Sequence, residues 1–218
     1  MSKDQVKCLL NLANSGDLAN LSDKLDDYLS GSQTARLQDI VHQKSGDGLL
    51  HILSRFGHLD CLRCLLTKPH VSVDQRNLED KAALHEAAQF GQDEAVGILL
   101  DHGAQVNSLK RADWTPLMLA ATKLNNLASV KLIIAAGADL SLVNKDGWTA
   151  FHLAVRTGDL RLVEFLLQAE PGCWQTASKN GRTPLHTACT HLSTRPGCEL
   201  LGLIWLHSSH GCCQGRPS

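Results

Sequence analysis

Apolar positions recur along the chain with a period of 33 or 34 residues. Each period opens with a four-residue segment that ends in an apolar residue followed by His, except for Leu117-Met118 in the third period. A pair of branched aliphatic residues follows later in the period and recurs at the same spacing. The opening segments are Gly48-Leu49-Leu50-His51, Ala82-Ala83-Leu84-His85, Thr115-Pro116-Leu117-Met118, Thr149-Ala150-Phe151-His152 and Thr183-Pro184-Leu185-His186. The aliphatic pairs are Leu65-Leu66, Leu99-Leu100, Ile133-Ile134 and Leu166-Leu167. A fixed period of this length predicts a solenoid, in which each unit buries its apolar face against its neighbours.

The repeating unit carries start and stop signals for two short helices. Thr followed by Pro, as in Thr115-Pro116, is typical of a helix N-cap and the first helical position. In three units a glycine falls six residues after the His, where a positive φ ends the first helix, and two further glycines end a second helix. These glycines are Gly57, Gly91, Gly158, Gly103 and Gly137. We therefore expect an elongated stack with a long exposed groove and no enclosed pocket, which favours binding over catalysis.

The combination of Thr-Pro-Leu-His, two helices and a glycine that ends the second helix resembles the ankyrin-repeat family. The resemblance implies an all-α ankyrin-repeat solenoid, whose helix-turn-helix repeats are connected by β-hairpin-like loops. It also implies a non-enzymatic protein–protein interaction scaffold that needs no cofactor. In ankyrin-like proteins, residues of the hairpin and the pair of residues before the interhelical glycine face the concave surface and carry specificity.

Three regions of the chain differ in how well they follow the period. Residues 1–43 fit a degenerate N-terminal helical capping repeat made of two short amphipathic helices. Residues 44–191 hold about four full ankyrin repeats and a partial fifth. In the third repeat Asn125 stands near the expected interhelical glycine, and because Asn tolerates left-handed geometry we expect a bulged but intact turn. Residues 192–218 form a divergent tail, for which a helix over the last repeat and a disordered segment both stay open.

The charge balance argues against direct binding of nucleic acid or of a membrane. The 21 Lys and Arg residues against 22 Asp and Glu residues give a net charge of −1, whereas a protein that binds polyanionic surfaces usually has a basic excess. The chain opens without an apolar stretch of signal-peptide length and holds no apolar run of membrane-span length. We expect a monomeric protein of the cytoplasm, the nucleus or both.

Histidine and cysteine are frequent enough to raise the question of a metal site. His51, His85, His152 and His186 occur once per repeat, too far apart to share one metal ion, so we interpret them as structural hydrogen-bonding groups. The eight cysteines form no framework and are interpreted as free thiols, and the Cys61-x-x-Cys64 pair has no second pair nearby. Zinc binding by the tail is a weaker alternative, with candidate ligands Cys198, His207, His210, Cys212 and Cys213. We predict no metal and no catalytic residue.

Candidate partner-binding residues follow from the register of the repeat. The position just before the Thr of each repeat holds, in order, Asp47, Lys81, Trp114, Trp148 and Arg182. Two adjacent repeats thus place tryptophan, a frequent interface anchor, where we expect no core to fill. The alternative is that the two indoles pack on one another or on the next hairpin.

A second row of the same register is mostly basic. Three positions earlier stand Lys44, Leu78, Arg111, Lys145 and Lys179, at the expected hairpin tips. A solvated charged face is the alternative reading of such a row. Combined with the tryptophans, the row and the groove residues make an aromatic and cationic strip that fits an acidic protein surface. The groove residues are Arg55, Phe56, Phe90 and Arg156.

Residues 78–191 further resemble the ankyrin-repeat accessory factor of alanyl-tRNA synthetase. The resemblance rests on three segments, Lys110-Arg111-Ala112-Asp113-Trp114-Thr115-Pro116-Leu117-Met118, Asn144-Lys145-Asp146-Gly147-Trp148 and Arg182-Thr183-Pro184-Leu185-His186-Thr187-Ala188, and on Pro171-Gly172-Cys173-Trp174. It implies that alanyl-tRNA synthetase is the partner and that the chain limits the mischarging of serine. The alternative is an adaptor for another intracellular protein.

The same resemblance implies that surface lysines accept misactivated serine. Lys145 matches one acceptor position, whereas Arg111, with Lys110 beside it, and Gln175 occupy two others. An acceptor must be a neutral amine, which Arg cannot provide and Lys provides only when its pKa is lowered. The candidate acceptor or basic-row residues are therefore Lys145, Lys110, Arg111 and Lys179.

Overall fold

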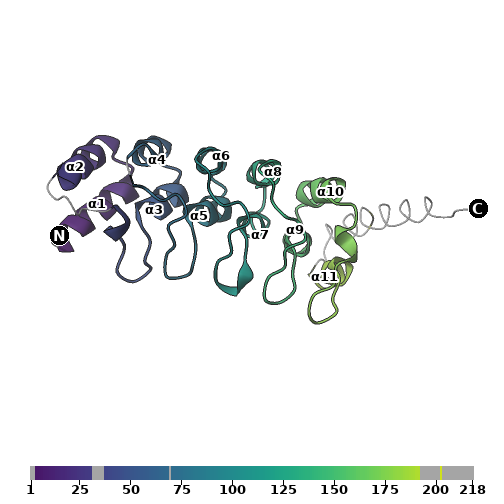
Figure 1. Cartoon of the computed structure of the whole chain (residues 1–218). Coiled ribbons are helices and arrows are strands. Elements are labelled where there is room, and N and C mark those ends of the chain that lie inside the picture. The colour runs from purple at the N-terminus through teal and green to yellow at the C-terminus, as the bar shows by residue number, and fades with distance from the viewer. Residues whose placement is uncertain (1–2, 31–36, 69, 192–201, 203–218) are drawn as a thin grey trace, which may run out of the picture.

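The computed structural model describes residues 3–30, 37–68, 70–191 and 202, and over these residues the chain is an elongated helical solenoid (Figure 1). Within them it contains eleven α-helices, three short 3-10 helices and no strand, so the predicted all-α fold is confirmed. In chain order the elements are α1 (Lys3–Ser15), α2 (Leu18–Ser30), η1 (Leu37–Asp39), α3 (Leu49–Phe56), α4 (Leu59–Leu66), α5 (Ala83–Phe90), α6 (Asp93–Asp101), η2 (Arg111–Asp113), α7 (Pro116–Ala120), α8 (Leu127–Ala135), α9 (Ala150–Thr157), α10 (Leu160–Ala169), η3 (Cys173–Gln175) and α11 (Pro184–His191).

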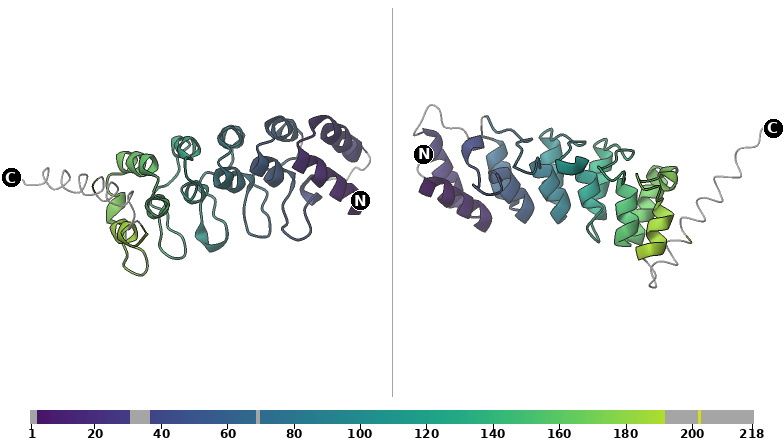
Figure 2. Two further views of the ribbon diagram at one scale, coloured as in Figure 1. Left: turned by 180° about the vertical axis from the view of Figure 1, so that it is seen from behind. Right: turned by 90° about the horizontal axis from the view of Figure 1, so that it is seen from below.

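The helices stack in two rows, and the loops between helix pairs project on one side (Figures 1 and 2). The first helix of each pair contacts the first helix of the next pair, as in α3 with α5 and α5 with α7. Small residues such as Ala87, Ala88 and Ala154, all fully buried, let these helices approach closely. Both helices of a pair supply larger core side chains, such as the fully buried Leu84 of α5 and, from the predicted aliphatic pairs, Leu99 and Ile133.

The helix ends follow the chemistry expected from the sequence. The Thr115 hydroxyl accepts a hydrogen bond from the Met118 backbone N–H at 3.2 Å and so caps α7, which begins at Pro116. Gly91 ends α5 in the left-handed region, with φ of 64°. Asn125 takes the same conformation in the third repeat, with φ of 59°, so the predicted left-handed Asn turn is confirmed.

The repeated histidines form hydrogen bonds that connect one repeat to the next. His85 Nδ1 accepts the Ala82 backbone N–H at 3.1 Å, and its Nε2 therefore carries the proton and donates to the Ser108 carbonyl, 3.0 Å away in the following repeat. His51 bridges in the same way to the Lys81 carbonyl at 2.8 Å. Burial, aided by the charge of Arg76, lowers the pKa of His85 to about 3, so the ring stays neutral. The predicted structural hydrogen-bonding role is confirmed for these residues.

The hairpin tips are tied to one another by single backbone hydrogen bonds. Each tip residue of the predicted basic row after Lys44 donates its N–H to a carbonyl of the preceding hairpin, with N···O distances of 3.0 to 3.1 Å. The donor and acceptor pairs are Leu78 to Ser45, Arg111 to Glu79, Lys145 to Ala112 and Lys179 to Asp146. This ladder places the side chains of the row in register along one edge of the solenoid. The predicted tail, residues 192–218, lies outside the described residues except for residue 202.

Candidate functional site

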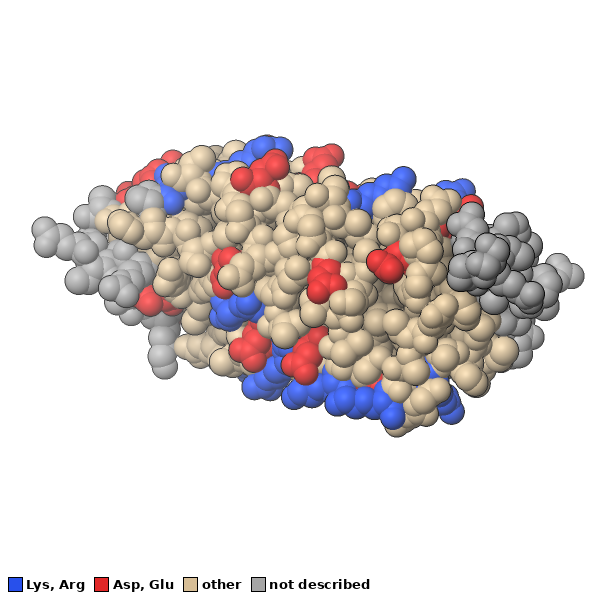
Figure 3. All heavy atoms as spheres, turned by 45° about the vertical axis from the view of Figure 1, so that its right-hand side comes forward, with Lys and Arg blue, Asp and Glu red and all other residues tan. Residues whose placement is uncertain are grey.

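Basic side chains gather along the edge of the solenoid that the hairpin tips form. Figure 3 shows Lys and Arg along the lower edge of the molecule, with Asp and Glu side chains close above them. The residues that hold tip positions and are exposed are Lys44, Leu78, Arg111, Lys145 and Lys179. Four of these five carry a positive charge, so this edge attracts anionic surfaces at short range.

The two tryptophans lie beside this edge, and each is covered by a cation of its own repeat. Lys110 Nζ lies 5.6 Å from the Trp114 ring centroid, and Arg156 Cζ lies 5.2 Å from the Trp148 ring centroid. Both indoles are half-buried and pack against the core. The expectation that these positions have no core to fill is therefore wrong. Among the described residues the two indoles make no ring contact with each other, and Trp148 instead meets His152, with ring centroids 5.7 Å apart.

A partly buried ion network joins the first two repeats on the same side. Arg55 binds the carboxylates of Asp47 at 2.8 Å and of Glu86 at 2.9 Å, and Lys81 Nζ lies 3.3 Å from both Glu86 and Glu79. Burial alone would raise the pKa of Asp47, but hydrogen bonds from Asn77 and Arg55 outweigh it and lower that pKa. Lys81 is half-buried and paired with Glu86 within this network, so its charge is largely neutralised inside the protein.

An open hollow of about 590 Å³ lies over this network. Its lining includes Lys44 and Arg111 from two hairpin tips, and Glu86 from α5. The Glu86 side chain is only 1% exposed, and its Oε1 has the ion pair with Lys81 but no hydrogen bond. The hollow is therefore lined by both acidic and basic side chains. The positive charges in its lining that are not part of the ion network belong to the tip residues Lys44 and Arg111.

Three exposed apolar side chains lie just before the left-handed turn between the two helices of their repeats. Phe56 is 51% exposed, Phe90 40% and Leu124 57%. Each precedes the residue that turns the chain with a positive φ, which is Asn125 in the case of Leu124. Phe56 and Phe90 were candidates from the sequence, and Leu124 was not. The sequence does contain a signal for Leu124. Gly57 and Gly91 come six residues after the His of their repeats, whereas Asn125 comes seven residues after Met118, so the equivalent position is shifted by one residue.

Of the candidate acceptor lysines, Lys110 is half-buried and lies over the Trp114 ring. Burial lowers the pKa of Lys110, and the nearby charge of Lys81 lowers it further. Lys145 and Lys179 are exposed at the hairpin tips, and Arg111, the neighbour of Lys110 in the sequence, is exposed as well. Arg182 in the fifth repeat and Gln175 in η3 are also exposed. The predicted basic residues therefore share one edge but differ in burial.

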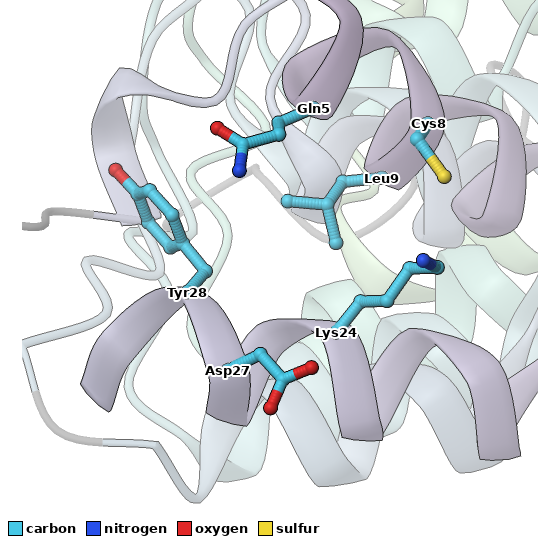
Figure 4. A pocket seen from close by; sticks show the side chains of 6 residues that line it. All are labelled: Gln5, Cys8, Leu9, Lys24, Asp27 and Tyr28. Carbon is cyan, nitrogen blue, oxygen red and sulfur yellow. The ribbon is translucent and has the colours of Figure 1, made fainter. Parts of the chain in front are cut away.

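Two other features of the described chain lie away from this face. A hollow of about 180 Å³ opens between α1 and α2 at the N-terminal end, and Figure 4 shows its lining by Gln5, Cys8, Leu9, Lys24, Asp27 and Tyr28. Cys61 is buried, and burial raises its pKa, while Cys64 contacts the Ser22 hydroxyl at 3.8 Å. Among the described residues no three His, Cys, Asp or Glu side chains are grouped to bind a metal ion, and the cysteine and histidine cluster of the tail lies outside those residues.

Comparison with known families and proteins agrees with the repeat pattern. A family model described as "Ankyrin repeats (3 copies)" matches residues 3–110 and 117–202. BCL-6 corepressor-like protein 1 of Homo sapiens is 35% identical over 115 residues, which cover 53% of this chain and 6% of that protein. The B-cell lymphoma 3 protein homolog of Mus musculus is 30% identical over 139 residues, which cover 62% of this chain and 31% of that protein.

A third relative bears the name of an enzyme. Glycerophosphocholine phosphodiesterase gde1 of Schizosaccharomyces pombe is 41% identical over 86 residues, which cover 38% of this chain and 7% of that protein. The chain thus spans a minor part of the length of each of these relatives. In the described part of the chain, no helix has the length and apolar character needed to cross a membrane.

Proposed function

The chain belongs to the ankyrin-repeat family, whose repeats are protein–protein interaction modules, and we propose that it binds its partner with the edge formed by hairpin tips and tryptophans. The observation that carries this proposal is the pair of half-buried indoles, Trp114 and Trp148, each covered by a cation, Lys110 from the hairpin and Arg156 from α9. A half-exposed tryptophan is a costly surface group in a monomer and a frequent anchor in an interface. The basic tips supply the long-range attraction that orients an acidic partner.

For the identity of the partner we propose alanyl-tRNA synthetase. This step rests on the resemblance of residues 78–191 to ankyrin repeat domain-containing protein 16. It also rests on the basic row, which includes Lys145 and Arg111 at positions that the resemblance matches. In this role the chain is an accessory factor that limits the mischarging of serine. The alternative partner is another protein with an acidic surface, and the distant relatives, which bear the names of unrelated proteins, leave that alternative open.

For the capture of misactivated serine we propose Lys110 ahead of Lys145. The neutral Lys110 amine attacks the acyl carbon of seryl-adenylate, an amide bond forms, the bond to AMP breaks, and the nitrogen releases its proton. A lowered pKa increases the fraction of neutral amine at pH 7, and burial provides this for Lys110. Mass spectrometry after incubation with synthetase, serine and ATP tests the step: serine on Lys110 supports it, and serine on Lys145 alone contradicts it.

Binding itself is tested by titrating the purified chain with alanyl-tRNA synthetase. The Trp114→Ala, Trp148→Ala double variant should weaken binding at least tenfold, since interface anchors typically contribute 2 kcal/mol or more, or roughly thirtyfold. Lys131→Ala is the matched control, because Lys131 covers Phe165 at 5.5 Å in the same kind of contact between the second helices α8 and α10. Binding that both variants keep would refute the proposed face, and no binding by the folded wild-type chain would refute this partner.

A further inference from the structure

One hollow joins the first three hairpin tips. Three tip residues, Lys44, Leu78 and Arg111, called the tip patch below, all line the hollow of about 590 Å³. Backbone hydrogen bonds hold their hairpins in register, because the Leu78 N–H donates to the Ser45 carbonyl at 3.0 Å and the Arg111 N–H donates to the Glu79 carbonyl at 3.1 Å. A ligand that fills the hollow therefore contacts the tip patch.

Leu78 is the apolar member of the tip patch. It is 59% exposed, more than any other large hydrophobic side chain in the described part of the chain, whereas the other four positions of the tip row hold Lys or Arg. Its side chain lies over the preceding hairpin, since a Cβ added at Gly46 would lie 2.8 Å from Leu78 Cγ. A single exposed leucine is ordinary on a protein surface, but one that lines a hollow can exchange water for an apolar group of a partner.

Two cations flank Leu78 in the tip row. Lys44 and Arg111 are both exposed, and within the described residues neither forms an ion pair. The other two cations that line the hollow, Arg55 and Lys81, are paired with carboxylates of the ion network. Exposed charges attract one another over about 8 to 10 Å at physiological salt, so carboxylates of a partner must approach the tips themselves. The hollow thus offers one apolar contact between two positive charges.

The ion network at the hollow restricts which anions fit. It contributes three carboxylates, those of Asp47, Glu79 and Glu86, against two cations, so it carries one negative charge in excess. A nucleic-acid strand has a phosphate about every 3.4 Å, and a strand laid along the tips would therefore also approach Glu79, whose side chain is 59% exposed. Two separate carboxylates, one at each tip cation, avoid this repulsion.

We propose that the hollow binds a protein segment that presents an apolar side chain between two acidic residues. The apolar side chain packs against Leu78, one carboxylate pairs with Lys44, and the other pairs with Arg111. This inference rests on the proposed protein-binding function and names the chemistry of the partner segment. It extends the interface from the tryptophan edge to the tips of the first two repeats.

A phage-displayed library of random peptides tests the inference without assuming how far apart the acidic residues stand. Phage are selected on the wild-type chain, and those that also bind the Leu78→Ser variant are removed, so the remaining peptides depend on the tip patch. These peptides should carry an apolar residue with Asp or Glu on both sides, at a spacing that recurs among independent sequences.

Polarisation titrations with one selected, fluorescently labelled peptide locate each contact. Leu78→Ser should weaken binding about tenfold or more, as expected for an interface anchor, and Lys44→Glu and Arg111→Glu should each weaken it about threefold or more. Replacing one acidic residue of the peptide by lysine should restore binding to one of the two charge-reversed variants and not to the other. That pattern gives the direction in which the peptide lies.

Two variants on second helices are matched controls. Leu132→Ser changes an apolar side chain of α8 that is 39% exposed, and Arg63→Glu reverses an exposed charge of α4. Both should bind the peptide as tightly as the wild type does. Circular dichroism and melting temperature verify that each variant is folded.

Several results would overturn the inference. One is that no selected peptide depends on the tip patch, and another is that the dependent peptides lack acidic residues on both sides of the apolar one. Equal loss of binding in Leu78→Ser and Leu132→Ser would also refute it. Tighter binding of a labelled single-stranded oligonucleotide than of the peptide, lost in Lys44→Glu, would assign the tip patch to nucleic acid instead.

A parallel titration with alanyl-tRNA synthetase separates this inference from the proposed function. If the synthetase binds, only the tryptophan double variant loses it, and no peptide depends on the tip patch, the function stands and this inference fails. If a peptide of the expected kind binds the tip patch and the synthetase does not bind, the inference stands and the proposed partner fails.

Discussion

Acidification should destabilise the protein through its buried histidines, and His85 carries the clearest case. The ring is fully buried, its Nδ1 accepts the Ala82 N–H, and its Nε2–H donates to the Ser108 carbonyl. Protonation would turn Nδ1 from an acceptor into a donor that faces another N–H, and it would bury a charge. The folded state therefore resists protonation, and the pKa of His85 falls to about 3.

The magnitude follows from proton linkage. Between the pKa in the folded state, about 3, and the usual value of 6.5 in the unfolded state, the unfolded chain binds the extra proton. The stabilisation is therefore complete above pH 6.5 and is lost progressively as the pH falls toward 3. At pH 5 the unfolded state gains a factor of about 30, so His85 alone should lower the free energy of unfolding by about 2 kcal/mol relative to pH 7.5.

Urea unfolding followed by far-UV circular dichroism at pH 7.5 and pH 5.0 measures this loss. The His85→Asn variant keeps an acceptor for the Ala82 N–H but does not titrate, so its loss on acidification should be about 2 kcal/mol smaller than that of the wild type. His51 and His152, whose pKa values burial also lowers, remain in both proteins and cancel in the difference. Equal losses in the two proteins would refute the reasoning.

Three further substitutions test the packing of the solenoid by urea unfolding at pH 7.5. Gly147→Ala should destabilise by about 1 to 2 kcal/mol, because φ is 79° and the new Cβ would lie 2.6 Å from the Lys179 backbone nitrogen; an unchanged midpoint would contradict this. Ile133→Ala should cost about 2 to 5 kcal/mol because the side chain is fully buried, and a loss under 1 kcal/mol would show a looser core. Thr149→Ala should cost about 1 kcal/mol through the lost cap of α9, with the half-buried Thr176→Ala, whose hydroxyl caps no helix N-terminus, as the comparison.

The fold was predictable because its signals are local. Thr115 with Pro116 starts a helix, Gly91 ends one, and Asn125 replaces a glycine, and each rule needs only a few neighbouring residues. The repeat then supplies the long-range arrangement, since a unit that recurs every 33 or 34 residues can bury its apolar face only by stacking. The histidine role follows from the same register.

The candidate site was less predictable because it depends on contacts between repeats. The pairing of Arg55 with both Asp47 and Glu86 joins residues 8 and 31 positions apart, and no local rule fixes the side-chain conformations that allow it. The contact of Arg156 with Trp148 likewise arises from the packing of a helix against its own hairpin. The sequence therefore pointed to Trp114 and Trp148 as candidates but not to the cations, Lys110 and Arg156, that cover them.

The central claim is that a protein partner binds the edge formed by the hairpin tips and tryptophans. Hydrogen–deuterium exchange of the chain, with and without saturating alanyl-tRNA synthetase, tests it most directly because it maps the footprint on the backbone. The account predicts slower exchange of hairpin amides in residues 110–114 and 144–148, with no change in the second helices α6 and α8. Protection confined to those second helices, with free exchange at the hairpins, would contradict it.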